Sequence, residues 1–147
     1  MKNLLFTLSA VILIALTSAK PNVSVSETEN NSGITFHEGN WNEALQLSKK
    51  EGKPIFLDIS AGWCGPCKML KANTFPDSEV GEFYNSNFIN VAVDGEKGEG
   101  IELARKYRIK GYSTLLFVNP DGKVVSQTAG YRSPKQFVEL GKQVVKM

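Results

Sequence analysis

The two cysteines of the chain, Cys64 and Cys67, are separated by only two residues in the segment Trp63-Cys64-Gly65-Pro66-Cys67. A disulfide that stabilises a fold gains most from closing a long loop, and a loop this short closes almost none. The spacing therefore favours a disulfide that is made and broken, with a thiolate as the nucleophile of the exchange.

This pair lies where a strand is expected to turn into a helix. Residues 54–59 form a short apolar run typical of a buried strand. Residues 64–74 predict a helix, which Pro76 kinks or ends. The unpaired N–H groups at a helix start favour an anion, so we expect the pKa of Cys64 to be lowered. Cys67, one turn later, is placed to attack a mixed disulfide at Cys64. Pro66 suits a first turn, and Trp63 would lie beside the exposed sulfur and shape the substrate surface.

Two other uses of the pair are an inert bridge and one end of a metal site. The chain has two Cys and one His, His37, which is too few for four tetrahedral zinc ligands without help. We expect His37 to be a surface residue at a strand end without a role. The sequence therefore predicts redox chemistry, with no metal and no cofactor.

Alternating strand and helix patterns surround the pair. Asn40 and Glu43 predict a capping box, and Gly52 predicts the end of that helix. The segment Asn119-Pro120-Asp121-Gly122 predicts a turn between antiparallel strands. The other expected elements are strands at 34–36, 88–93, 114–118 and 123–129, and helices at 78–85, 101–107 and from Ser133 onward. This order predicts an α/β fold, a mixed central sheet with helices on both faces.

The chain divides into three segments. Lys2, an apolar run over residues 4–16 and Thr17-Ser18-Ala19 predict a signal peptide over residues 1–19. An apolar run of this length reaches only about 20 Å, short of a bilayer core of about 30 Å, although an uncleaved anchor is the alternative. Polar residues 20–33 are expected to form a flexible linker, and residues 34–147 a single domain. We therefore expect the protein to be exported, to the periplasm or out of the cell, with the signal peptide cleaved.

The charge of the chain excludes one class of partner. Seventeen Lys and Arg against fifteen Asp and Glu give a net charge of +2. No basic stripe interleaved with aromatic residues is present, so we expect no binding to nucleic acid. We expect a monomer.

The segment from Phe56 to Lys68, with the tryptophan and the C-G-P-C sequence, resembles the active-site segment of the thioredoxin family. Further matches are Val93-Asp94, residues 104–109, Lys110-Gly111, residues 114–117 and Gly130. The resemblance spans about residues 54–132 and implies a thioredoxin fold. Residues 73–77 also look like secreted thioredoxin-like domains that receive electrons from membrane transporters.

The resemblance implies a role for Asp58 as the buried acid beneath the dithiol. Burial would raise its pKa, and the carboxylate would take the proton of Cys67. The alternative is a partly exposed aspartate at a strand end. Lys68 would add positive charge nearby or be a solvated helix residue.

Substrate contacts are expected at Trp63, Gly65, Pro66, Tyr112 and Ser113. Ser113 departs from the family, which has a cis-proline before the Thr that is here Thr114. A cis bond before a residue other than proline costs about 2.5–4 kcal/mol, so we expect a trans Tyr112–Ser113 bond. The family proline shapes the edge on which substrate backbone pairs and keeps metal off the sulfurs.

These features predict a protein-disulfide reductase that acts on exported, disulfide-containing proteins and contributes to redox homeostasis. A reductant in an oxidising compartment needs electrons, which implies a membrane-bound donor. The alternatives are a disulfide oxidase or isomerase, and a binding module in which two chains hold a metal or iron–sulfur cluster through four cysteines.

Overall fold

The computed structural model describes residues 32–147, so the predicted signal peptide and nearly all of the predicted linker lie outside the described residues. The elements in chain order are α1 (Trp41–Glu51), β1 (Ile55–Ser60), α2 (Gly65–Met69), the π-helix η1 (Leu70–Thr74), α3 (Ser78–Asn87), β2 (Ile89–Asp94), α4 (Gly98–Lys106), β3 (Thr114–Val118), β4 (Val124–Ala129) and α5 (Pro134–Val145). None of the helices formed by residues 32–147 combines the length and apolar character needed to cross a membrane.

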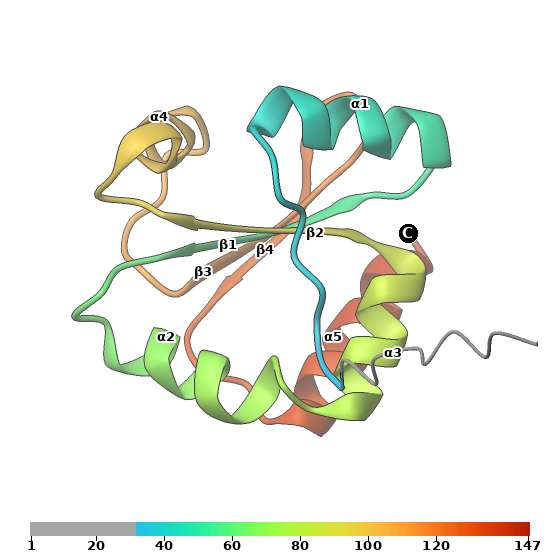
Figure 1. The fold of residues 1–147 in the computed structure, drawn as a ribbon, viewed down its shortest axis with the longest axis vertical. Coiled ribbons are helices and arrows are strands. Elements are labelled where there is room, and N and C mark those ends of the chain that lie inside the picture. Colours follow the sequence, from blue (N-terminus) through green and yellow to red (C-terminus); the bar gives the residue numbers. More distant parts are fainter. Residues whose placement is uncertain (1–31) are drawn as a thin grey trace, which may run out of the picture.

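The strands form one mixed sheet in the order β2-β1-β3-β4. β1 runs parallel to β2, with Ile55 opposite Ile89, and antiparallel to β3, with Ile55 opposite Val118. β3 and β4 form an antiparallel hairpin with a register shift at Phe117/Val118. Helices α1 and α4 lie on one face of the sheet, and α2, α3 and α5 on the other (Figure 1). The predicted fold class is confirmed.

Local sequence signals account for several element boundaries. The Asn40 side chain accepts the backbone N–H of Glu43, whose side chain accepts the N–H of Asn40, so the predicted capping box is present. Gly52 ends α1 with a φ of 66°, in the left-handed region that favours glycine. In the hairpin, Asn119 Oδ1 accepts two backbone N–H groups and Gly122 has a φ of 80°.

The core is divided by the sheet into two layers. Alternate β1 residues face opposite sides, so Phe56 packs with α3 and α5 while Ile55, Leu57 and Ile59 pack with α1 and α4. On the Phe56 side, the ring of Tyr84 stacks on that of Phe137 with centroids 4.3 Å apart. Asp58 and Ser60 share the face of Phe56, so both point into the layer that α2 and η1 cover.

The predicted strand at residues 34–36 is wrong. The backbone of this segment makes isolated hydrogen bonds and no continuous strand pairing. The N–H of Ile34 donates to Phe75 O and that of His37 to Asn90 O, each at 2.7 Å. The N–H of Thr35 between them donates to the Asn85 side chain of α3, and Phe75 directly follows η1, so no single strand supplies a continuous register. His37 is therefore half-buried, not a surface residue at a strand end, and its Nε2 has no hydrogen-bond partner.

The segment before the predicted domain start is also packed. Gly33 is buried, and its carbonyl accepts the Asn85 amide at 3.0 Å. Gly33 lies so close to Gly81 on α3 that a Cβ on Gly81 would be 2.6 Å from Gly33 Cα. This close approach requires glycine at position 81.

The predicted helix over residues 64–74 is divided in two. α2 ends at Met69, and the next turn widens so that the N–H of Phe75 donates to Leu70 O at 2.9 Å, an i to i+5 bond. Within this turn the hydroxyl of Thr74 donates to Arg132 O at 2.6 Å, which ties η1 to the loop before α5.

Candidate active site

The dithiol lies at the start of α2, as predicted. Cys64 is the N-cap of the helix, with extended backbone angles, and its Sγ accepts the N–H of Cys67 at 3.2 Å. The two sulfurs form a disulfide, with 5.3 Å between the Cα atoms. Pro66 occupies the first turn, where no hydrogen bond is lost. In the reduced state the same N–H would stabilise a Cys64 thiolate.

The two cysteines differ in access. Cys64 retains 5% exposure and Cys67 only 1%, so both are more enclosed than an exposed sulfur beside Trp63 would suggest. Gly65, Pro66 and Lys68 are exposed on the outer side of α2, and Trp63 is 69% exposed. A partner molecule would therefore reach the disulfide on the Cys64 side, next to the indole.

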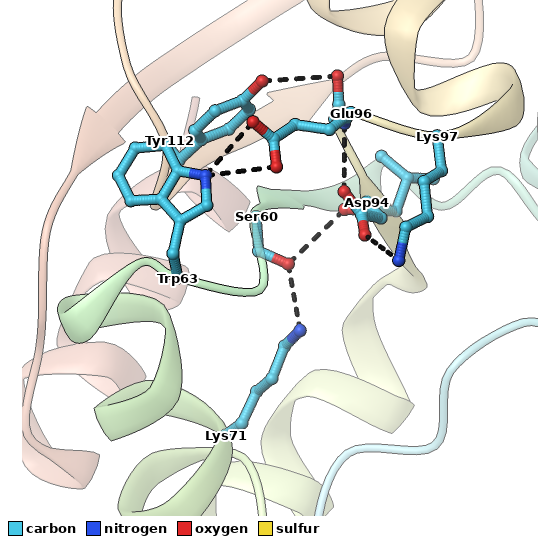
Figure 2. A network of polar contacts seen from close by, with 9 residues as sticks. Ser60, Trp63, Lys71, Asp94, Glu96, Lys97 and Tyr112 are labelled. Carbon is cyan, nitrogen blue, oxygen red and sulfur yellow. Dashed lines mark hydrogen bonds and ion pairs between the residues drawn. The ribbon is translucent and has the colours of Figure 1, made fainter.

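Trp63 is held by residues from two distant loops. Its Nε1 donates to both carboxylate oxygens of Glu96 at 3.1 Å (Figure 2). The ring of Tyr112 packs edge-on against the indole, 5.5 Å between centroids, and Tyr112 also packs against the disulfide cluster with Ala61. An exposed tryptophan is thus presented in a defined orientation beside the disulfide.

Asp58 lies in the middle of β1 and is fully buried, as predicted, with no hydrogen-bond partner for either carboxylate oxygen. Burial raises the pKa of Asp58 from 3.8 to about 7, while the positive charge of Lys71 and the neighbouring Ser60 hydroxyl oppose the rise. A carboxyl group that titrates near neutral pH can either accept or donate a proton there.

Ser60 and Lys71 form a polar link beside this carboxyl group. Lys71 Nζ donates to Ser60 Oγ at 3.0 Å, from η1 across to the end of β1 (Figure 2). Neither residue was among the predicted site residues. The signals were present: Ser60 is two residues after Asp58 and so shares its face of the strand, and Lys71 follows Cys67 by four residues, one helical turn.

Glu96 was missed for a different reason. It lies two residues beyond β2, and only the parallel pairing of β1 with β2 places it beside the residues that follow β1. The N–H of Glu96 donates to Asp94 Oδ1 at 3.0 Å, and this bond holds the pKa of Asp94 below its usual range. Asp94 also pairs with Lys97 at 3.3 Å.

Ser113 has the expected trans bond, since residues 32–147 contain no cis peptide bond. The residue is buried and has a φ of 62°, which is in the left-handed region. Its Oγ has no partner, and its carbonyl accepts the N–H of Gly130 at 3.0 Å. The Tyr112–Ser113 loop is thus fixed by its link to the residue after β4.

The structure brings Trp63, Cys64, Cys67 and Tyr112 together at one end of the sheet, with Asp58 in the layer covered by α2. His37 lies at the opposite end, where its N–H meets the start of β2. Within the described part of the chain, no three His, Cys, Asp or Glu side chains are grouped to hold a metal ion.

Comparison with known proteins gives consistent matches. The family model described as a thioredoxin-like domain matches residues 41–145. A solution structure from Bacteroides thetaiotaomicron, provisionally assigned as a disulphide-isomerase, is 43% identical with a TM-score of 0.65, over 76% of this chain and 95% of that one.

Two curated sequences extend the comparison. Thioredoxin H2-1 of Oryza sativa is 30% identical over 79% of this chain and 80% of its own length. The thiol:disulfide interchange protein DsbD of Yersinia pestis is 29% identical over 63% of this chain, and the match spans only 16% of that longer protein.

Proposed function

The chain belongs to the thioredoxin-like family, and from that premise we propose that it is a thiol–disulfide oxidoreductase that reduces disulfides in exported proteins. The observation that carries the proposal is the placement of Cys64 as the N-cap of α2 with Cys67 one turn behind it. The exposed Trp63 and the buried Asp58 supply, respectively, a contact surface and a proton acceptor. Trp63, Gly65, Pro66, Tyr112 and Ser113 are proposed to contact substrate.

The reaction has two exchanges. The Cys64 thiolate attacks one sulfur of a substrate disulfide; the other substrate sulfur leaves as a thiolate and takes a proton from solvent. Asp58 accepts the proton of Cys67, and the Cys67 thiolate attacks Cys64 Sγ. The second substrate sulfur leaves as a thiolate and takes a proton from solvent, and the Cys64–Cys67 disulfide remains. Two electrons pass from the dithiol to the substrate.

A pKa of about 7 suits Asp58 for this step. Near neutral pH both forms of the carboxyl group are present: the ionised form can accept the Cys67 proton, and the protonated form can return it when the disulfide is reduced again. An exposed aspartate with an ordinary pKa would be a much weaker base.

The direction of electron flow is proposed from the C-G-P-C sequence, the predicted export and the similarity to part of a thiol:disulfide interchange protein. A reductase in an oxidising compartment must be reduced again, so we propose a membrane-bound dithiol donor. The disulphide-isomerase assignment of the Bacteroides relative favours isomerisation as the second candidate.

The reduction potential of the Cys64–Cys67 couple separates the two candidates. A reductase is expected near the thioredoxin value of about −270 mV, whereas an isomerase is expected near about −180 mV. Cys64→Ser should abolish reduction of a disulfide-containing protein, and Cys67→Ser should trap a mixed disulfide at Cys64. If Cys64→Ser retained activity, or if Cys67 were the thiol with the lower pKa, the proposed mechanism would be wrong.

A further inference from the structure

We propose that a basic groove beside the disulfide binds acidic residues of the substrate chain, so that disulfides flanked by aspartate or glutamate are reduced preferentially. The groove is formed by Arg105, Arg108 and Lys110 around the loop that ends at Tyr112. The proposal rests on the proposed function, because it assigns a substrate class to that site.

Two hollows open on either side of this loop, with volumes of about 460 and 740 Å³. Both are lined by Arg108, Lys110, Gly111 and Tyr112. The smaller hollow continues along α4 to Arg105, and the larger reaches residues 127–129 of the edge strand β4. The cationic side chains therefore border a surface that is recessed on both sides of the loop.

The cations of the groove lack an internal partner. The ion pairs of residues 32–147 are Lys53–Glu51, Lys97–Asp94 and Lys142–Glu139. Arg105, Arg108 and Lys110 are all exposed and take part in none of these described pairs. Their charges are consequently available to carboxylates of another molecule.

Two carboxylates near the loop are already engaged. Glu96 accepts both of its bonds from Trp63, and Asp94 pairs with Lys97 and with a backbone N–H. Glu96 orients the indole, and Asp94 lies behind it, next to Lys97 (Figure 2). Neither carboxylate forms an ion pair with Arg105, Arg108 or Lys110 among the described pairs.

The backbone at Arg108 gives a second, independent indication. Arg108 has a φ of 49°, and its N–H donates to Arg105 O at 3.1 Å as α4 ends. Glycine is the residue that adopts this conformation without strain. An arginine at this position weakens the fold, and strained residues of this kind cluster at functional sites.

Tyr112 connects the groove to the chemistry. It lines both hollows, packs edge-on against Trp63 and contacts the cluster that contains Cys64 and Cys67. A substrate chain with its disulfide at Cys64 would therefore run from the Trp63 surface over Tyr112 and into the groove. Acidic residues a few positions from the substrate cysteine would meet Arg108 and Lys110.

The test uses two synthetic peptides that each contain one disulfide and differ only in having flanking aspartates or flanking asparagines. The reduced protein is expected to act faster on the acidic peptide, with an advantage that falls as salt is added. In Arg108→Gln/Lys110→Gln the ratio of kcat/KM for the acidic and neutral peptides should fall by about 5- to 20-fold, since exposed ion pairs contribute up to ~1 kcal/mol each.

Lys49→Gln/Lys50→Gln is the matched control. It removes the same charge from the last turn of α1, before β1 begins, at the end of the sheet opposite the disulfide. The ratio should remain at the wild-type value. An equal fall in both double variants would attribute the effect to net charge and overturn the proposal.

Binding separates failure of the groove from failure of the proposed function. The acidic peptide with both cysteines replaced by serine should bind the wild-type protein in low salt, and Arg108→Gln/Lys110→Gln should weaken this binding. If neither disulfide peptide is reduced but the serine peptide still binds in this way, the proposed function fails and the groove stands. Equal reduction of both peptides with no charge-dependent binding would overturn the groove.

Discussion

Asp58→Asn separates the effect of the buried carboxyl group on stability from its effect on catalysis. Asp58 is 0% exposed and its carboxylate oxygens have no hydrogen-bond partner, so the ionised form is strongly disfavoured in the fold. The substitution keeps the shape of the side chain and removes its ability to ionise. We expect a more stable protein that exchanges disulfides more slowly at neutral pH.

The size of the stability effect follows from the pKa. Folding raises the pKa of Asp58 from 3.8 to about 7, roughly 3 pH units, and one unit corresponds to 1.36 kcal/mol. Ionisation of Asp58 therefore removes about 4 kcal/mol of unfolding free energy. Because the folded pKa is the higher one, this stability is fully present below about pH 4 and is lost as the pH rises to 7 and above.

The assay is urea unfolding of the oxidised protein at several pH values. The unfolding free energy of Asp58→Asn minus that of the wild type should increase by about 4 kcal/mol between about pH 4 and pH 8. Any cost of burying the asparagine amide does not depend on pH, so it shifts the difference without changing its slope. Asp121→Asn, which removes an exposed carboxylate, controls for the change in net charge.

A difference that stays constant across this range would refute the reasoning, because it would mean that Asp58 ionises equally well in the folded and unfolded chain. The proposed catalytic role of Asp58 is tested separately, by the rate of disulfide reduction. If Asp58→Asn reduced disulfides at the wild-type rate at neutral pH, another group would be accepting the Cys67 proton.

Further substitutions at three positions test residues whose surroundings the fold determines. Lys71→Met removes a positive charge that opposes the rise in the pKa of Asp58, so the midpoint of the Asp58-dependent stability loss should move to higher pH. Lys68→Met, which removes another exposed lysine, is the control and should leave the midpoint unchanged. An unchanged midpoint in Lys71→Met would exclude this role. Ser113→Gly should raise the midpoint of thermal unfolding and Ser113→Pro should lower it, because a φ of 62° suits glycine and is inaccessible to proline. A proline variant more stable than the wild type would contradict this loop conformation. Gly81→Ala should cost about 1–3 kcal/mol in urea unfolding because its Cβ would overlap Gly33, and a neutral effect would mean that this contact is loose.

Much of the fold could be predicted from local patterns, because the residues that determine these features are close in sequence. The Asn40 and Glu43 capping box and the turn at Asn119 depend on short-range hydrogen bonds. The strand over residues 114–118 is indicated by a short, continuous apolar run, and all five of its residues are buried. The dithiol was predicted for the same reason. Its chemistry depends on a strand, a helix start and a two-residue spacing, all of which are contained within residues 54–67.

Other features were decided only when distant segments met. The strand expected at residues 34–36 fails because the N–H groups of this segment bond to three separate parts of the chain, at Phe75, Asn85 and Asn90. Glu96 reaches Trp63 only because β1 and β2 are parallel neighbours, so the loops after the two strands share one edge of the sheet. The raised pKa of Asp58 likewise depends on how completely the packed helices exclude water, which no local pattern measures.

The amino-acid sequence alone therefore identifies the two residues that can exchange electrons, Cys64 and Cys67, because thiol chemistry depends on residue type and spacing. The tertiary structure decided what surrounds them. It turns Lys71 toward Ser60, holds Ser113 in a left-handed conformation and leaves Arg108 beside an open groove. These contacts depend on the order in which β2, β1, β3 and β4 pair, since that order brings four separate loops to one end of the sheet.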